Sequence, residues 1–239
     1  SKKEELEKLL DTNLTEIRRL LKRVKDVLDR NLEVVRRVIE ELARLLDEVT
    51  EVVRRLIDDE KLLREVEKVA EDIKRELERI LREYEKLVED IKRELKRLLE
   101  ELERAHREIK KEVERDGPDD RVLKKLKELN DDLLRAIKEI NDKVKKLNED
   151  LRKKIEKIAR EVLKLIEDVK RKLKEKGRLD EKVKRELEKL IKRVKDILDD
   201  IRRRLKKVNE EHEREADRLR RELERLDREL KKRMDDIRR

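Results

Sequence analysis

Apolar residues in this chain never occur in runs longer than two, yet they return along almost its whole length at a helical spacing. Residues three and four apart lie on one face of a helix, and the pattern repeats at those intervals. One sample is the set Leu20, Leu21, Val24, Val27, Leu28, Leu32, Val34, Val35, Val38, Ile39 and Leu42. This stripe is wider than the seam of a two-stranded coiled coil, so it predicts helices that pack against two neighbours in a shared core. Runs this short exclude a membrane span, and the opening SKKEELEKLL predicts no signal peptide.

Charged residues make up 59% of the chain and hydrophobic residues 35%. So charged a composition is found both in disordered chains and in long helices. The apolar residues are periodic rather than scattered, which favours helices. Cysteine is absent, so disulfides and thiolate metal sites are excluded.

The two glycines give the clearest helix boundaries. In RDGPDD, Gly117 follows one predicted helix, Pro118 cannot continue it, and an aspartate can cap the next. In EKGRLDEK, Gly177 ends a helix and Asp180 caps the following one. These breaks leave a first segment about twice as long as the other two.

A third turn is predicted near Asp58 and Asp59, although no glycine or proline lies there. The stretch DDEKL resembles the capped start at Asp180, and Leu62, Val122 and Val183 then follow the three starts at nearly even intervals. A continuous helix over residues 2–116 is the competing interpretation.

The chain is therefore predicted to be all-α, with helices over residues 2–57, 60–116, 120–176 and 180–238 in one domain spanning residues 1–239. Short connections make consecutive helices antiparallel, which gives an up-down-up-down four-helix bundle of long helices of about 57 residues. Apolar residues recur more consistently at a spacing of 18 than at 7 or 11. Eighteen residues are five turns of a regular helix, so the helices are predicted to be nearly straight.

A few polar residues occupy the apolar stripes or their flanks. They are Asn13, Asn31, Tyr84, His106, Asn130, Asn141, Asn148, Asn209 and His212. In antiparallel helices joined by short turns, the residue numbers also give each side chain's height along the bundle.

The heights group these residues into two layers. The first holds Asn31, Tyr84, Asn148 and Asn209 within about one helical turn of one level, and Asn141 with His212 could extend it. The second, near one end, holds Asn13, His106 and Asn130. A buried amide, phenol or imidazole is costly unless it is hydrogen-bonded, so side chains at one level can satisfy one another. A satisfied layer penalises any shifted register, so we expect the nine residues to form structural networks that fix helix register.

The sequence argues against a catalytic or metal-binding role for these residues. His106 and His212 lie on different levels and cannot share a metal ion, and no inward-facing Glu-x-x-His pair exists. The only serine is Ser1. We therefore expect no enzyme, no catalytic residue, no cofactor and no metal. A pH-sensitive role for the buried histidines stays open.

The net charge of +9 is unevenly distributed. Residues 1–118 carry 31 Lys+Arg and 34 Asp+Glu, whereas residues 119–239 carry 44 and 32. Acidic residues are interspersed throughout and aromatic residues are nearly absent, which argues against specific nucleic-acid binding. A solvated helix surface explains the charge.

The restricted alphabet, the even helices of about 60 residues, the Asp-capped loops and the sparse Asn/His/Tyr core set resemble computationally designed single-chain helical bundles with buried hydrogen-bond networks. The resemblance covers the whole chain. It implies a hyperstable monomeric scaffold, soluble when produced recombinantly, with no natural compartment, activity or required partner.

Two other classes remain. One is a designed interaction module: the two hairpins could be a linked heterodimer, a cage for a partner helix or a switch component, and a designed partner or oligomer is compatible with the pattern. The other is a natural spectrin-like or apolipoprotein-like helical protein. Those proteins usually carry Gln, Ser, Phe or Trp and irregular loops, which this chain lacks except for Ser1.

Overall fold

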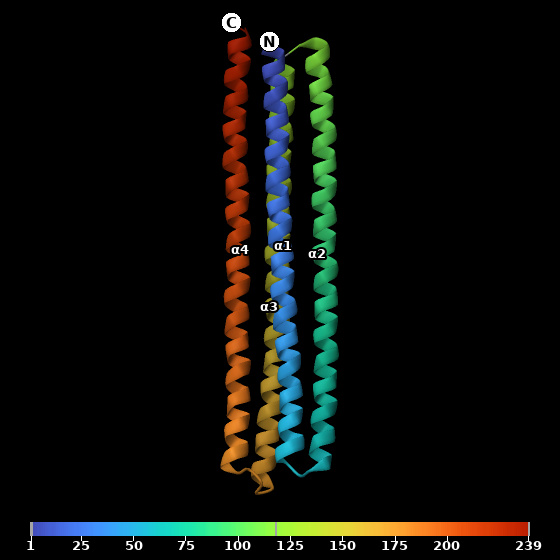
Figure 1. Ribbon diagram of the computed structural model, residues 1–239, viewed down its shortest axis with the longest axis vertical. Coiled ribbons are helices and arrows are strands. Elements are labelled where there is room, and N and C mark those ends of the chain that lie inside the picture. The colour runs from blue at the N-terminus through green and yellow to red at the C-terminus, as the bar shows by residue number, and fades with distance from the viewer. Residues whose placement is uncertain (1, 118, 239) are drawn as a thin grey trace. The chain divides into compact units, whose positions relative to one another are not determined.

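The computed structural model describes residues 2–117 and 119–238, and these form four α-helices (Figure 1). The bounds are Lys2–Leu56 for α1, Glu60–Asp116 for α2, Asp120–Glu175 for α3 and Glu181–Arg238 for α4. Consecutive helices run in opposite directions, so the predicted all-α, up-down-up-down bundle is confirmed, as is the turn near Asp59. Ser1 and Pro118, the predicted helix terminator, lie outside the described residues.

The helices contribute segments to two compact units. Unit 1 comprises Ser1–Asp29, Val88–Lys145 and Val208–Arg239, and unit 2 comprises Arg30–Leu87 and Lys146–Lys207. Each unit therefore contains a segment of all four helices. The single domain expected over residues 1–239 stays a prediction.

Ion pairs join the same four pairs of neighbouring helices in each unit. In unit 2 they are Arg36–Glu85 between α1 and α2, Glu65–Lys172 between α2 and α3, Glu156–Arg202 between α3 and α4, and Glu48–Arg193 between α1 and α4. In unit 1 they are Arg18–Glu103, Glu112–Lys125, Lys145–Glu213 and Glu5–Arg233, in the same order. Most of these side chains are well exposed, so each pair adds little stability.

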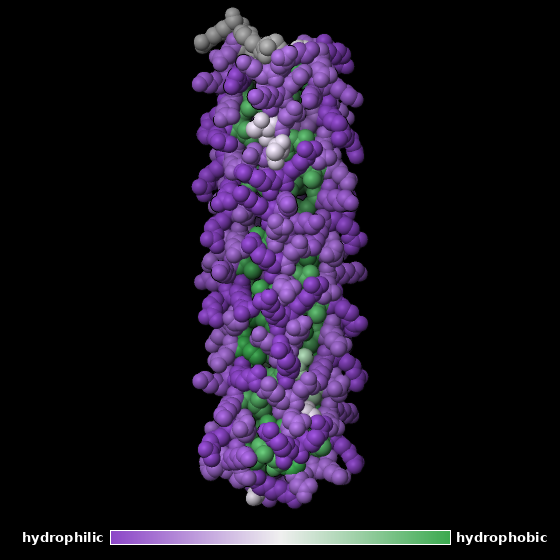
Figure 2. All heavy atoms as spheres, in the orientation of Figure 1, coloured by the Kyte–Doolittle hydropathy of each residue, from purple (hydrophilic) through white to green (hydrophobic). Residues whose placement is uncertain are grey.

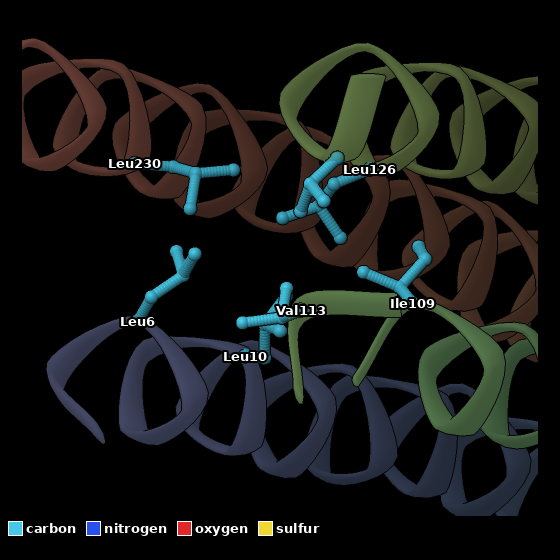
Figure 3. Close-up of a cluster of buried hydrophobic side chains, with 7 residues drawn as sticks. Leu6, Leu10, Ile109, Val113, Leu126 and Leu230 are labelled. Carbon is cyan, nitrogen blue, oxygen red and sulfur yellow. The ribbon is translucent and has the colours of Figure 1, made fainter. Parts of the chain in front are cut away.

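The stability of each unit comes from its apolar core. In unit 1 one cluster draws on all four helices and consists of Leu6, Leu10, Ile109, Val113, Val122, Leu126 and Leu230 (Figure 3). Hydrophilic side chains cover most of the surface seen in Figure 2, with apolar atoms showing between them in narrow stripes. The wide stripe predicted for α1 is buried in both units except for the half-buried Val34, because each segment of α1 packs against two neighbouring helices.

Two helices end on a glycine in the left-handed region. Gly117 has φ 79° and Gly177 has φ 67°. The Gly117 N–H donates to the Val113 carbonyl at 2.9 Å, which is an αL termination of α2. At the end of α3, the Gly177 N–H donates to Lys174 O at 3.1 Å and the Arg178 N–H to Leu173 O at 2.9 Å, which is a Schellman motif.

Replacing Gly177 with alanine is expected to lower the free energy of unfolding by about 1–2 kcal/mol, because a Cβ disfavours positive φ. A Cβ at Gly177 would meet no atom within 4 Å, so backbone strain alone sets the effect. Urea denaturation measures the change. Gly177→Asn is the matched control and should lose less, because Asn tolerates this region. Equal stability of the alanine variant and the parent would contradict the assignment.

The α1–α2 turn needs no glycine because side chains stabilise it. The Asp59 carboxylate accepts the Leu62 N–H at 3.1 Å and caps α2. Lys176 also donates to that carboxylate, and Arg178 Nη1 donates to the Asp58 carbonyl at 2.8 Å. The Lys176 ammonium and the Leu62 N–H hold the pKa of Asp59 below its usual value.

Aspartates cap the other two internal helix starts in the same way. Asp119 Oδ1 accepts the N–H groups of Arg121 and Val122 at 3.0 and 3.2 Å, and Asp180 Oδ1 accepts the Val183 N–H at 2.8 Å. The predicted Asp180 cap is therefore confirmed. The aspartates alone were enough to predict these helix starts, because an N-cap side chain bonds to backbone groups only two or three residues away.

Candidate functional site

Three of the predicted polar residues meet in the core of unit 2. Asn31 on α1, Tyr84 on α2 and Asn148 on α3 are 0, 2 and 1% exposed, and together they are called the unit 2 layer. Asn31 Nδ2 donates to Asn148 Oδ1 at 2.8 Å and also to the Tyr84 hydroxyl. The Tyr84 hydroxyl donates to Asn148 Oδ1 at 2.8 Å. The bonds close a triangle over three helices.

The donors and acceptors of this triangle have unequal roles. Asn148 Oδ1 is the acceptor for both partners, whereas Asn31 acts as a donor and leaves its own buried Oδ1 without a partner. Burial raises the pKa of Tyr84, so its hydroxyl keeps the proton that it donates. A buried acceptor without a partner costs free energy, so the hydrogen-bonding capacity of Asn31 is the least satisfied in the layer.

A second set of bonds runs through all four helices of unit 1. Asn13 Nδ2 lies 3.0 Å from His106 Nε2 and donates to Asn130 Oδ1 at 3.5 Å, and Asn130 Nδ2 donates to Asp227 Oδ1 at 2.9 Å. These four residues, from α1, α2, α3 and α4, are called the unit 1 layer. The predicted level for Asn13, His106 and Asn130 is thus occupied by one chain of bonds, in which Asn13 links His106 to Asn130.

Its neighbours determine the tautomer of His106. Nδ1 lies 2.9 Å from the Leu102 carbonyl, which can only accept, so Nδ1 carries the hydrogen. Nε2 is then free to accept from the Asn13 amide. Burial lowers the pKa of His106, with a further lowering from Arg18, and the Leu102 carbonyl and Asp11 oppose this.

Asp227 is the member of the unit 1 layer that sequence reasoning missed. It is half-buried, and burial raises the pKa of its carboxyl while the Asn130 amide lowers it. The same height relation that pairs the other helices places Asp227 level with Asn130 across the α3–α4 turn. That signal was present, but a charged residue at the edge of a stripe in so charged a chain is typical of solvated surface.

The other three predicted residues lie in unit 1. His212 on α4 is buried, and Asn209 on α4 and Asn141 on α3 are half-buried. The buried Oδ1 of Asn141 has no hydrogen-bond partner. Asn209 and Asn148 belong to different units, so their pairing stays a prediction, as does the extension of the first layer by Asn141 and His212.

The surroundings of the two layers are mostly apolar core. The hydrogen-bonded groups lie in the core, and the groove of about 60 Å³ beside Tyr84 is flanked by Glu83 and Lys154, which form an ion pair at 3.3 Å. Within residues 2–117 and 119–238, no group of three or more His, Cys, Asp or Glu residues could hold a metal ion. Over the same ranges, every helix is too polar to qualify as a membrane span.

Comparison of the chain with protein-family models, with curated proteins and with solved structures finds no match in any of the three.

Proposed function

We propose that this chain is a designed structural scaffold in which buried polar layers fix the register of the helices. One observation carries the proposal: three side chains from three helices form a closed hydrogen-bonded triangle in the core of unit 2. The triangle needs Asn31, Tyr84 and Asn148 at one height, so a shift of one helix leaves buried polar groups unpaired.

The unit 1 layer supports the same role. It links Asn13, His106, Asn130 and Asp227 from the four helices, so a shift of any one helix would break at least one bond. Leucines at these positions would bury more apolar surface but would also pack in several registers. Polar residues at these positions therefore favour a single helix register at some cost in the free energy of unfolding.

The test replaces the whole unit 2 layer with apolar residues of similar size, as Asn31→Leu, Tyr84→Phe and Asn148→Leu together. We expect equal or higher thermal stability, because no polar atom of the layer then remains buried. We also expect α1 and α3 to occupy several axial positions relative to each other, which broadens the distribution of distances between them. The chain has no cysteine, so spin labels on Arg37→Cys and Lys153→Cys can report the distance across unit 2.

The parent with the same two labels is the control and should give one narrow distance distribution. A slip of one heptad moves a residue by about 10 Å along the axis, which pulsed electron resonance resolves. The unit 1 layer still links α1 to α3 in the triple variant, so a distribution as narrow as in the parent would show that the unit 2 layer is not required to set the register.

A further inference from the structure

The C-terminal half of α4 has a gap in its apolar contacts inside unit 1. Val208 and Leu219 are buried, but no apolar side chain between them is. The inward-facing positions of those three turns carry Asn209, His212 and the small, half-buried Ala216. This part of the helix is therefore held by much less apolar surface than a typical core-facing helix.

Ala216 leaves space beside α3. A groove of about 520 Å³ lies between α3 and α4, with Leu134, Ile137 and Ala216 among its apolar lining residues. Side chains that border such a space have lost dispersion contacts on that side. α4 is thus loosely packed against α3 at the level where its own apolar stripe is interrupted.

The side of α4 that faces α1 brings the like-charged Glu222 and Glu16 together, although an ion pair between Arg23 and Glu215 at 4.0 Å also joins the two helices there. Glu222 contacts Glu16, and burial together with this like-charged neighbour raises the pKa of Glu222. Arg19 lies 2.7 Å from Glu16 but 3.8 Å from Glu222. Buried carboxylate oxygens of Glu222 and Glu215 have no hydrogen-bond partner. These oxygens would regain water if α4 moved away.

Beyond the gap, four leucines attach α4 to the rest of unit 1. Leu219, Leu223, Leu226 and Leu230 are buried, and Leu230 is the α4 member of the seven-residue cluster in Figure 3. Cooperative contacts of this kind release together. Asp227 lies in the same stretch, so its bond with Asn130 would break in the same event.

We infer that residues 209–238 of α4 form a separable segment, which leaves α1, α2 and α3 of unit 1 as one cooperative body without global unfolding. The stretch over residues 209–218 buries no apolar side chain, and this is the reason that the opening extends this far into the helix. In the open form, Leu230 leaves the seven-residue apolar cluster, so the six members on α1, α2 and α3 become more exposed to water.

Hydrogen–deuterium exchange of the full chain, read by mass spectrometry under native conditions, tests the segment. Amides of residues 209–230 should exchange at one common rate, at least about tenfold faster than amides of residues 183–205 in the same helix. Simple fraying of the C-terminus predicts instead a gradient that is confined to the last turns. Equal protection of the two stretches, or such a gradient, would overturn the inference.

Two substitutions test whether the Glu222–Glu16 contact and the space beside Ala216 cause the opening of residues 209–238. Glu222→Gln removes the like-charged contact with Glu16 and should slow exchange over residues 209–230 at least about twofold. Glu229→Gln, at an exposed position of the same helix, is its matched control and should change little. Ala216→Leu should also slow exchange by filling the groove. If Glu222→Gln and Ala216→Leu both leave the exchange of residues 209–230 unchanged, the inference is wrong.

Discussion

Replacing Asn148 with leucine is expected to lower the free energy of unfolding by about 2–6 kcal/mol. Asn148 Oδ1 accepts from both Tyr84 and Asn31 at 2.8 Å, so its loss leaves a buried O–H and a buried N–H without their acceptor. Each such group costs about 1–3 kcal/mol. Urea denaturation monitored by circular dichroism measures the change.

Asn31→Leu is the matched comparison, because it removes a donor from the same triangle. The Tyr84 hydroxyl still donates to Asn148 after this change, and the buried Asn31 oxygen that has no partner disappears. Stability should therefore be retained or rise. Equal losses from the Asn31 and Asn148 variants would contradict the unequal roles assigned to the two amides.

Acidification is also expected to lower the free energy of unfolding, because the buried imidazole of His106 would have to become charged. The pKa of His106 is lowered from its ordinary value of 6.5, chiefly by burial. Below pH 6.5 the unfolded chain binds a proton that the folded chain does not, so this residue's contribution to stability falls as the pH drops. The contribution is complete above pH 6.5 and declines down to the lowered pKa of the folded state.

Protonation also conflicts with the geometry of the unit 1 layer. The new hydrogen on Nε2 would face the Asn13 amide nitrogen 3.0 Å away, which is itself a donor. The neighbours on α1 have opposing effects, since Arg18 lowers the pKa of His106 and Asp11 raises it. Burial and Arg18 together outweigh the Leu102 carbonyl and Asp11, because the pKa of His106 is lowered overall.

The measurement compares the parent with His106→Gln, which cannot titrate. Carboxylates that are not coupled to His106 contribute equally to the unfolding free energies of both proteins from pH 8 to pH 4, so the difference reports His106 together with the coupled Asp11. We expect the parent to lose stability relative to the variant below pH 6.5. A flat difference would contradict a lowered pKa of His106 in the folded state.

Much of the fold follows from local signals. Asp59 and Asp180 cap their helices and Gly117 and Gly177 end theirs, because caps and positive φ act over a few residues. The turn at Asp59 was the hardest boundary to foresee. Its support from Lys176 and Arg178 comes from residues more than a hundred positions away, so no local pattern contains it.

Periodicity and helix boundaries were enough to predict the four helices, their antiparallel order and the common levels of the residues that bond within each unit, because helical rise and short turns convert residue number into position along the axis. Which of those residues bond to one another became clear from the packing of the helices. This packing made Asn148 the shared acceptor, placed Asn13 between His106 and Asn130, and added Asp227. These outcomes depend on lateral distance and side-chain direction across neighbouring helices, which periodicity along one helix does not encode.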